Sequence, residues 1–154
     1  MIEGFNPTLL LVLNLAGTFV FGLSGGLAGV RARLDAFGVA VLAVAVALAG
    51  GVIRDVLIGR RPETFHDWRY LAVAGGAGLV AFVAGGLVDR YVGVVDVFDA
   101  AGLSLFSVSG ASIALQYRVP AVDAVAIGTF SAIGGGMTRD VLMRRVPVVL
   151  HEGL

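Results

Sequence analysis

Residues 49–55 read AGGVIRD, and residues 134–140 read GGGMTRD. A Val-Leu pair follows both copies. Each copy places adjacent glycines and then an Arg-Asp couple in an otherwise apolar segment. Glycines weaken a helix and free its backbone carbonyls to interact elsewhere. Ionisable side chains are costly inside a long apolar segment, so they indicate a functional site. We therefore interpret the two stretches as parts of a membrane pore or carrier.

Composition agrees with a membrane location. Of the 154 residues, 58% are hydrophobic and only 14% are charged, and the mean hydropathy is +0.94. A soluble domain of this length has too much surface to cover with so few charges. The formal net charge is zero, which gives no indication of a nucleic-acid partner. Cysteine is absent, which excludes disulfides and thiolate chemistry. No nucleophile–base set or phosphate loop is present, so the sequence predicts neither an enzyme nor a cofactor.

Five apolar segments predict five transmembrane helices, at about residues 8–30, 36–53, 70–88, 97–117 and 120–140. Segments of this length cross a hydrocarbon core of about 30 Å. They lack the polar stripe of a surface helix, and they are too long to be buried strands. The first segment is too long for a signal peptide and has Glu3 in place of a basic region, so we expect it to be a retained span.

Local signals set the expected boundaries. Asp35 is placed to cap the second helix, and Gly59 suits its C-terminal end. Trp68 and Tyr70 fit an aromatic belt at the headgroups. Pro120 is tolerated in the first turn of the fifth helix.

The first segment also has small residues spaced four apart, at Gly22 and Gly26 and at Gly25 and Gly29. This spacing lets two helices approach closely. We expect close packing within one chain, and the alternative is a contact between copies.

The sequence repeats itself at an offset of 85 residues, which aligns residues 16–67 with 101–152 without a gap. Matches include Arg33/Arg118, Arg54/Arg139, Asp55/Asp140, Arg60/Arg145, Pro62/Pro147 and His66/His151. The offset carries three spans, an odd number, so the second copy crosses the membrane in the opposite direction. Inverted repeats with broken helices are typical of transport proteins.

We therefore predict an all-α membrane protein with one domain over residues 1–154. Repeat one covers about residues 8–90, and repeat two covers about residues 97–154 with two helices only. Six arginines fall on one side and five on the other, so the loop charges do not orient the chain.

The paired glycine–Arg-Asp motif near the ends of the second and fifth spans, each with a proline seven residues on, resembles the trimeric intracellular cation (TRIC) channel family. Its bacterial branch was formerly labelled a "glycine transporter" domain family. The resemblance covers nearly the whole chain. It implies a bacterial inner-membrane protein with a seven-helix protomer, made of two inverted three-helix repeats and a final helix. It also implies a homotrimer with a potassium-permeable pore in each protomer, lined where the second and fifth helices kink at their glycines.

Two departures from the family pattern stand out. The first motif begins with Ala49, so the triple glycine is complete only in the second copy. The chain also ends where the sixth helix is expected, so we expect the second repeat to be truncated here.

The candidate pore and ion-binding residues come from the two motifs and the fourth span: Gly50, Gly51, Gly134, Gly135, Gly136, Arg54, Asp55, Arg139, Asp140 and Asp99. Helices interrupted at these glycines would offer carbonyl oxygens in place of the water shell of a cation. The alternative is that the glycines only permit the second and fifth helices to cross closely.

The Arg-Asp couples have two interpretations. Neighbouring residues point about 100° apart on a helix, so Arg54 and Asp55 are not expected to pair with each other. In the first interpretation, Asp55 and Asp140 concentrate cations at the two pore mouths while the arginines brace the kinks by bonding freed carbonyls. In the second, both couples lie at the interface and the arginines extend to lipid phosphates.

Other polar residues suit simpler roles. Asp96 and Asp123 lie near helix starts, where a negative charge is favourable, and Asp99 is the deeper of its pair and is a candidate to face the pore. His66 and His151 fall in loops without ligand spacing, so no metal site is predicted.

The leading functional hypothesis is a potassium channel, with the lipid bilayer, a monovalent cation and two further copies of the chain as partners. A carrier for a small amino acid such as glycine is the second hypothesis. A nonconducting membrane fragment is the third.

Overall fold

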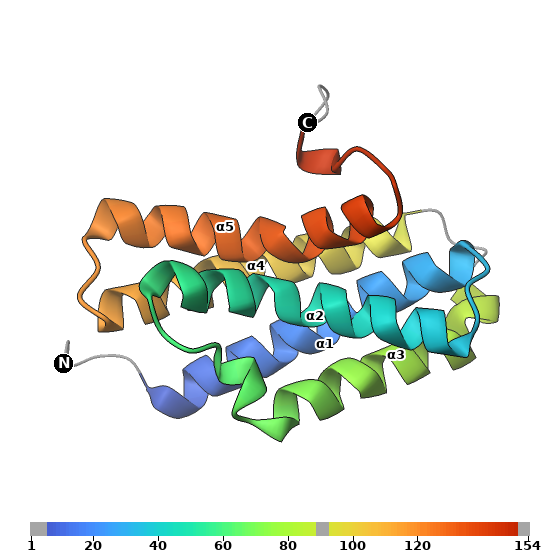
Figure 1. Ribbon diagram of the computed structural model, residues 1–154, viewed down its shortest axis with the longest axis horizontal. Coiled ribbons are helices and arrows are strands. Elements are labelled where there is room, and N and C mark those ends of the chain that lie inside the picture. The colour runs from blue at the N-terminus through green and yellow to red at the C-terminus, as the bar shows by residue number, and fades with distance from the viewer. Residues whose placement is uncertain (1–5, 89–92, 151–154) are drawn as a thin grey trace.

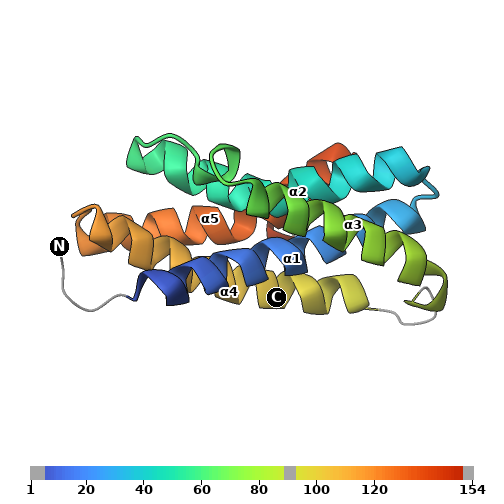
Figure 2. The same cartoon turned by 90° about the horizontal axis from the view of Figure 1, so that it is seen from below.

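A computed structural model describes residues 6–88 and 93–150. Five α-helices run alongside one another as a bundle: α1 (Pro7–Arg31), α2 (Ala36–Ile58), α3 (Trp68–Val88), α4 (Val94–Gln116) and α5 (Ala121–Leu142) (Figures 1 and 2). Two short 3-10 helices, η1 (Glu63–Phe65) and η2 (Val148–Leu150), follow α2 and α5. The described residues contain no strand, and all five α-helices have spans long and apolar enough to cross a membrane. The prediction of an all-helical membrane protein is confirmed.

Most helix boundaries follow the local signals. Asp35 Oδ1 accepts a hydrogen bond of 2.7 Å from the N–H of Gly38, and Gly59 ends α2 with a φ of 81°. Asn6 caps α1 by accepting from the N–H of Thr8 at 2.9 Å. Pro120 lies one residue earlier than expected, since it precedes α5 as its N-cap. The structure thus confirms the predicted caps of α2.

The first helix is the centre of the bundle, because α1 packs against α2, α3 and α4. Its glycines have no room for a side chain. A Cβ atom on Gly22 would lie 2.7 Å from the Cβ of Ala77, and one on Gly26 would lie 2.5 Å from the Cβ of Ala81. These contacts join α1 to α3, which confirms the predicted close packing within one chain.

The two halves run in opposite directions, since α1 is antiparallel to α4 and α2 is antiparallel to α5 (Figure 1). The rings of Phe21 and Phe106, equivalent at the offset of 85, stack with centroids 5.5 Å apart. Arg33 and Arg118, also equivalent, both adopt a positive φ after α1 and α4, at 57° and 60°. These relations fit the predicted inverted repeat.

Helix α3 has no counterpart after α5 in the described residues. Leu48 of α2 is buried in a cluster with Tyr70 and Ala74 of α3. Its equivalent, Ile133 of α5, instead lines an open cavity of about 350 Å³ together with Phe21 and Val149. The face that α3 covers in the first half is therefore uncovered in the second.

Tyr70 corrects one sequence-based expectation. Trp68 is 77% exposed, as an aromatic belt requires, but Tyr70 is only 2% exposed. Tyr70 lies two residues after Trp68 on α3, and its side chain points into the bundle. There it packs in the cluster that contains Ala47 and Leu48. The assignment of Tyr70 to the headgroup belt is wrong because its face of α3 is decided by packing against α2.

The glycine clusters lie where α2 and α5 cross. A Cβ atom on Gly50 would lie 2.3 Å from the carbonyl oxygen of Ser131, and one on Gly134 would lie 3.2 Å from the Cα of Gly50. Both helices continue without interruption through the clusters, so the predicted helix breaks are wrong. The missing side chains permit the close crossing without loss of the helical backbone bonds. The carbonyl of Gly50 also accepts a hydrogen bond of 3.1 Å from Ser131 Oγ.

This crossing gives a testable prediction. We expect Gly50→Ala to lower the free energy of unfolding by about 1–3 kcal/mol, because the added methyl group forces the two backbones apart. Gly75→Ala is the matched control, since a Cβ atom there meets nothing within 4 Å. Thermal unfolding in detergent compares the two variants. Equal melting temperatures for both would contradict the tight crossing.

Candidate functional site

Arg54 and Asp55 form a buried ion pair near the end of α2. Arg54 is 1% exposed and Asp55 is fully buried. Arg54 Nε donates to Asp55 Oδ1 at 2.8 Å, and Arg54 Nη1 donates to Oδ1 of Asn14 on α1 at 2.8 Å. The expectation that the neighbours do not pair is wrong, because the long arginine side chain folds back to its neighbour. With both groups buried, the lipid-phosphate interpretation is wrong for this couple.

Asp55 also holds the loop that follows α2. Its Oδ2 accepts from the N–H of Glu63 at 2.9 Å, and its Oδ1 lies 3.0 Å from Arg60 Nε. Arg60 donates further hydrogen bonds to Glu63 Oε2 at 2.9 Å and to the hydroxyl of Tyr117 at 3.0 Å. Burial opposes the charge of Arg60, but the bonds to Asp55 and Tyr117 outweigh it and raise the pKa of Arg60. The guanidinium therefore stays protonated.

A second buried site lies near the end of α5. Arg139 Nε and Nη2 donate to Asp140 Oδ1 at 2.9 and 2.8 Å, and Oδ2 of Asp140 accepts from the N–H of Val148 at 3.1 Å. Arg139 Nη1 donates to Asp99 of α4 and to Ser24 Oγ of α1, the latter at 2.9 Å. Ser24 Oγ donates in turn to Asp99 Oδ1 at 2.5 Å. Arg139 and Asp140 are each 5% exposed, so the lipid-phosphate interpretation is wrong here too.

The two sites use equivalent residues. At the offset of 85, Arg54 corresponds to Arg139 and Asp55 to Asp140, and the two loop N–H groups also correspond. The partner of each arginine on the preceding repeat helix is equivalent as well, namely Asn14 on α1 and Asp99 on α4. Because α2 and α5 are antiparallel, their ends place the sites toward opposite ends of the bundle (Figure 1).

The arginines do not act as predicted on the backbone. The described hydrogen bonds of both guanidinium groups go to side chains, and the Gly50 carbonyl accepts from Ser131 instead. The hypothesis that they brace kinks by bonding freed carbonyls is therefore wrong. The other cluster glycines fit against the sites and the core: a Cβ on Gly51 would lie 3.5 Å from Thr64, one on Gly135 would lie 2.9 Å from Phe21, and one on Gly136 would lie 3.7 Å from Asp99.

Each site borders a polar cavity of about 170 Å³. The two cavities are lined by residues that correspond at the offset of 85: Leu10/Val95, Leu11/Asp96, Arg60/Arg145, Glu63/Val148, Ile113/Ala28 and Gln116/Arg31. The first cavity also receives the buried side chain of Tyr70, whose hydroxyl has no protein partner. Unpaired buried hydroxyls are costly, so this cavity is suited to water or a polar solute.

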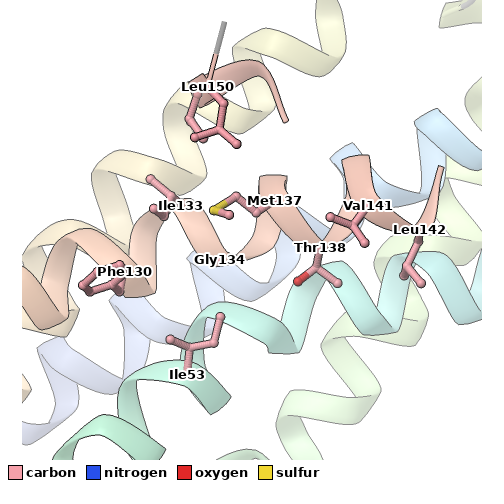
Figure 3. Close-up of a pocket in the computed structure, with 10 residues that line it drawn as sticks. Ile53, Phe130, Ile133, Gly134, Met137, Thr138, Val141, Leu142 and Leu150 are labelled. Atoms are coloured by element: carbon pink, nitrogen blue, oxygen red, sulfur yellow. The ribbon is translucent and has the colours of Figure 1, made fainter. Parts of the chain in front are cut away.

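A further cavity, of about 770 Å³, lies along α5 and is apolar (Figure 3). Ile53 of α2 points toward Gly134 at its floor, and Ile133, Met137 and Leu150 surround it (Figure 3). Apart from the hydroxyl of Thr138, the side chains that line it offer no oxygen to replace the water shell of an ion. This cavity is therefore not a candidate ion site.

The described residues contain no group of three or more His, Asp or Glu side chains arranged to hold a metal ion. His66 Nδ1 lies 3.2 Å from the carbonyl oxygen of Pro62, and His151 and Glu3 lie outside the described residues. Asp96 and Asp123 both lie in the first turns of their helices, in agreement with a favourable charge at a helix N-terminus.

Comparison with known proteins gives the family. A profile described as "Glycine transporter" matches residues 11–85 and 96–154. A UPF0126 membrane protein of Deinococcus radiodurans is 41% identical over 141 residues, which cover 91% of this chain and 66% of that protein. The crystal structure of the TRIC trimeric intracellular cation channel orthologue from Rhodobacter sphaeroides superposes with a TM-score of 0.90 at 32% identity, over 95% of this chain and 76% of that one. The chain belongs to the glycine transporter family and has the TRIC channel fold.

Further similar proteins agree with this result. The UPF0126 inner membrane protein YadS of Escherichia coli is 36% identical over 90% of this chain and 68% of its own length. A prokaryotic TRIC channel crystallised in 0.5 M KCl has a TM-score of 0.87 at 34% identity, over 93% of this chain and 74% of its own. The chain spans 66% of the Deinococcus relative and 44% of a Streptomyces coelicolor relative, so it matches only part of these proteins. The chain has five apolar helices and its relatives are bacterial membrane proteins, so it is an integral bacterial membrane protein.

Within this TRIC fold, sequence reasoning missed Asn14 and the role of Ser24. Asn14 lies two residues before the aligned repeat begins, so the alignment does not include its correspondence to Asp99. Extending the same offset by two residues reveals it. No sequence pattern predicts the buried hydroxyl of Tyr70, because its burial depends on how α3 packs against α2.

The first site gives a directional prediction. We expect Asp55→Ala to lower the free energy of unfolding by about 3–5 kcal/mol, because it leaves the buried Arg54 charge without a carboxylate. Arg54→Met should cost less, since Asp55 keeps Arg60 and the N–H of Glu63 as partners. Denaturant or thermal unfolding in detergent measures both. A larger loss for Arg54→Met would contradict the assigned network.

Proposed function

We propose that this chain forms a cation channel, with potassium as the permeant ion and a path within each protomer. The path runs beside the crossing of α2 and α5, from one polar cavity to the other and past both Arg–Asp sites. The observation that carries the proposal is the recurrence of a buried charged network and a polar cavity toward opposite ends of the bundle. The similarity to solved TRIC cation channels supports conduction of cations.

The chemistry of the sites suits this function. Polar side chains and carboxylates offer oxygen atoms to an ion that loses part of its water shell. Asp55, Asp140 and Asp99 supply negative charge inside an otherwise apolar bundle, and Arg54 and Arg139 hold them in position. The glycines bring α2 and α5 close enough for Ser131 and the Gly50 carbonyl to meet at the crossing.

Assembly and location complete the proposal. By analogy with the trimeric orthologue from Rhodobacter sphaeroides and the inner membrane protein of Escherichia coli, we propose a homotrimer in the bacterial inner membrane. The domain is a single one over residues 1–154, with the repeats at about 8–90 and 97–154.

A carrier for a small amino acid such as glycine is the second candidate. The description of the family supports it, and so does the first polar cavity, which presents Arg60 and Glu63 together. A zwitterion carries one charge of each sign and fits such a lining. Flux measurements separate the two candidates, because carrier flux saturates and discriminates by solute shape, whereas channel current follows voltage. Trimer formation without either activity would favour the nonconducting-fragment hypothesis.

The channel proposal predicts the effect of neutralising the carboxylates. We expect Asp55→Asn and Asp140→Asn to lower single-channel potassium conductance severalfold in planar bilayers, because each removes negative charge from the path. The control is Asp123→Asn, which removes an exposed carboxylate in the first turn of α5 that takes no part in the described contacts of either network. Size-exclusion chromatography verifies that each variant assembles as the parent does. Unchanged conductance and selectivity in both assembled variants would rule out the carboxylate role.

A further inference from the structure

The two buried networks share their arginine, their aspartate and their loop N–H, but the arginine has a different partner on the preceding repeat helix. Arg54 Nη1 donates to the neutral side chain of Asn14, whereas Arg139 Nη1 donates to the carboxylate of Asp99. Asn14 is 3% exposed, and the side chain of Asp99 is 23% exposed. At equivalent positions of one repeated framework, one end has a carboxamide and the other has a negative charge.

The charges in direct contact therefore do not match. At the first site, Arg54 and Arg60 are balanced by Asp55 and Glu63. At the second site, Arg139 faces both Asp99 and Asp140. The cavity beside this second site is also lined by Arg145, the equivalent of Arg60, and by Arg31 and Asp96. Among the described residues, Arg139 thus has two carboxylates within hydrogen-bonding contact, whereas the two arginines of the first site face two carboxylates.

We propose that Asp99 makes the two ends of the ion path electrically unequal, so that the channel passes cations more readily from the Asp99 end than from the Asn14 end. This inference rests on the proposed channel function. Fixed negative charge near one entrance raises the local cation concentration there, which increases the current that flows from that side. The effect weakens as added salt screens the charge.

The described contacts indicate which hydrogen bonds each substitution keeps. Asn14 accepts from its arginine at 2.8 Å, so an asparagine at position 99 can make the same bond to Arg139. Ser24 and Asp140 remain as partners of Arg139 in that variant. An aspartate at position 14 likewise reproduces the contact that Asp99 makes.

The first experiment measures rectification of the 154-residue chain in planar bilayers with equal KCl on both sides. A terminal peptide tag, blocked by antibody from one chamber, reports the orientation of each channel. We expect rectification in the parent, a nearly linear current in Asp99→Asn, and reversed rectification in the double variant Asn14→Asp with Asp99→Asn. Asp123→Asn should rectify as the parent does. A linear parent current, or Asp99→Asn that rectifies like the parent, would overturn the inference.

The second experiment tests the charge difference without requiring current. The chain has no cysteine, so Leu10→Cys and Val95→Cys place single thiols at equivalent positions in the two polar cavities. The rates of modification by a cationic and an anionic methanethiosulfonate of similar size are compared in each background. We expect Asp99→Asn to lower the cationic-to-anionic ratio severalfold at position 95, and Asn14→Asp to raise it at position 10.

The two experiments separate the inference from the channel function. Absence of any cation current in the parent would contradict the proposed function, and the thiol ratios would then still decide the charge difference. Ratios that do not respond to either substitution would overturn the inference even in a conducting channel.

Discussion

The structure depends on burying a guanidinium group beside a carboxylate in an apolar bundle. Removing two charges from water costs several kcal/mol for each ion, and good geometry with additional hydrogen bonds is needed to offset it. Asp55 meets this requirement with Arg54, Arg60 and the N–H of Glu63. One carboxylate thereby ties α2 to the loop that returns the chain to α3, while Arg54 ties α2 to α1 through Asn14.

The glycines stabilise the same helix contacts as these networks. Gly50 and Gly134 let α2 and α5 cross with backbones in contact, and Gly22 and Gly26 let α3 lie directly on α1. In a bilayer such contacts take the place of hydrophobic association between helices. Close crossing is also what places Ser131 within reach of the Gly50 carbonyl. The motif therefore joins tight packing and buried charge in one short stretch of sequence.

The sequence predicts well what is determined locally. Apolar length predicts the five helices, and Asp35 and Gly59 mark the ends of α2 because capping involves only adjacent residues. Prediction from the sequence fails where the length of a side chain or the packing of helices decides which groups meet. Helical geometry separates Arg54 from Asp55, yet three flexible methylene groups and a planar guanidinium bring them together. Tyr70 has an amphipathic side chain that fits the headgroup region, but the contact of α3 with α2 buries it.

The inverted duplication separates what the fold requires from what it merely allows. Both arginines need an oxygen acceptor on the preceding repeat helix, and both obtain one at the same position. A neutral carboxamide satisfies this need at Asn14, so a negative charge is not required for the geometry. A charged group in a membrane bundle is costly, and Asp99 carries that cost where its equivalent residue does not. Its charge therefore calls for an explanation in function, because the packing of the other half shows that stability alone does not demand it.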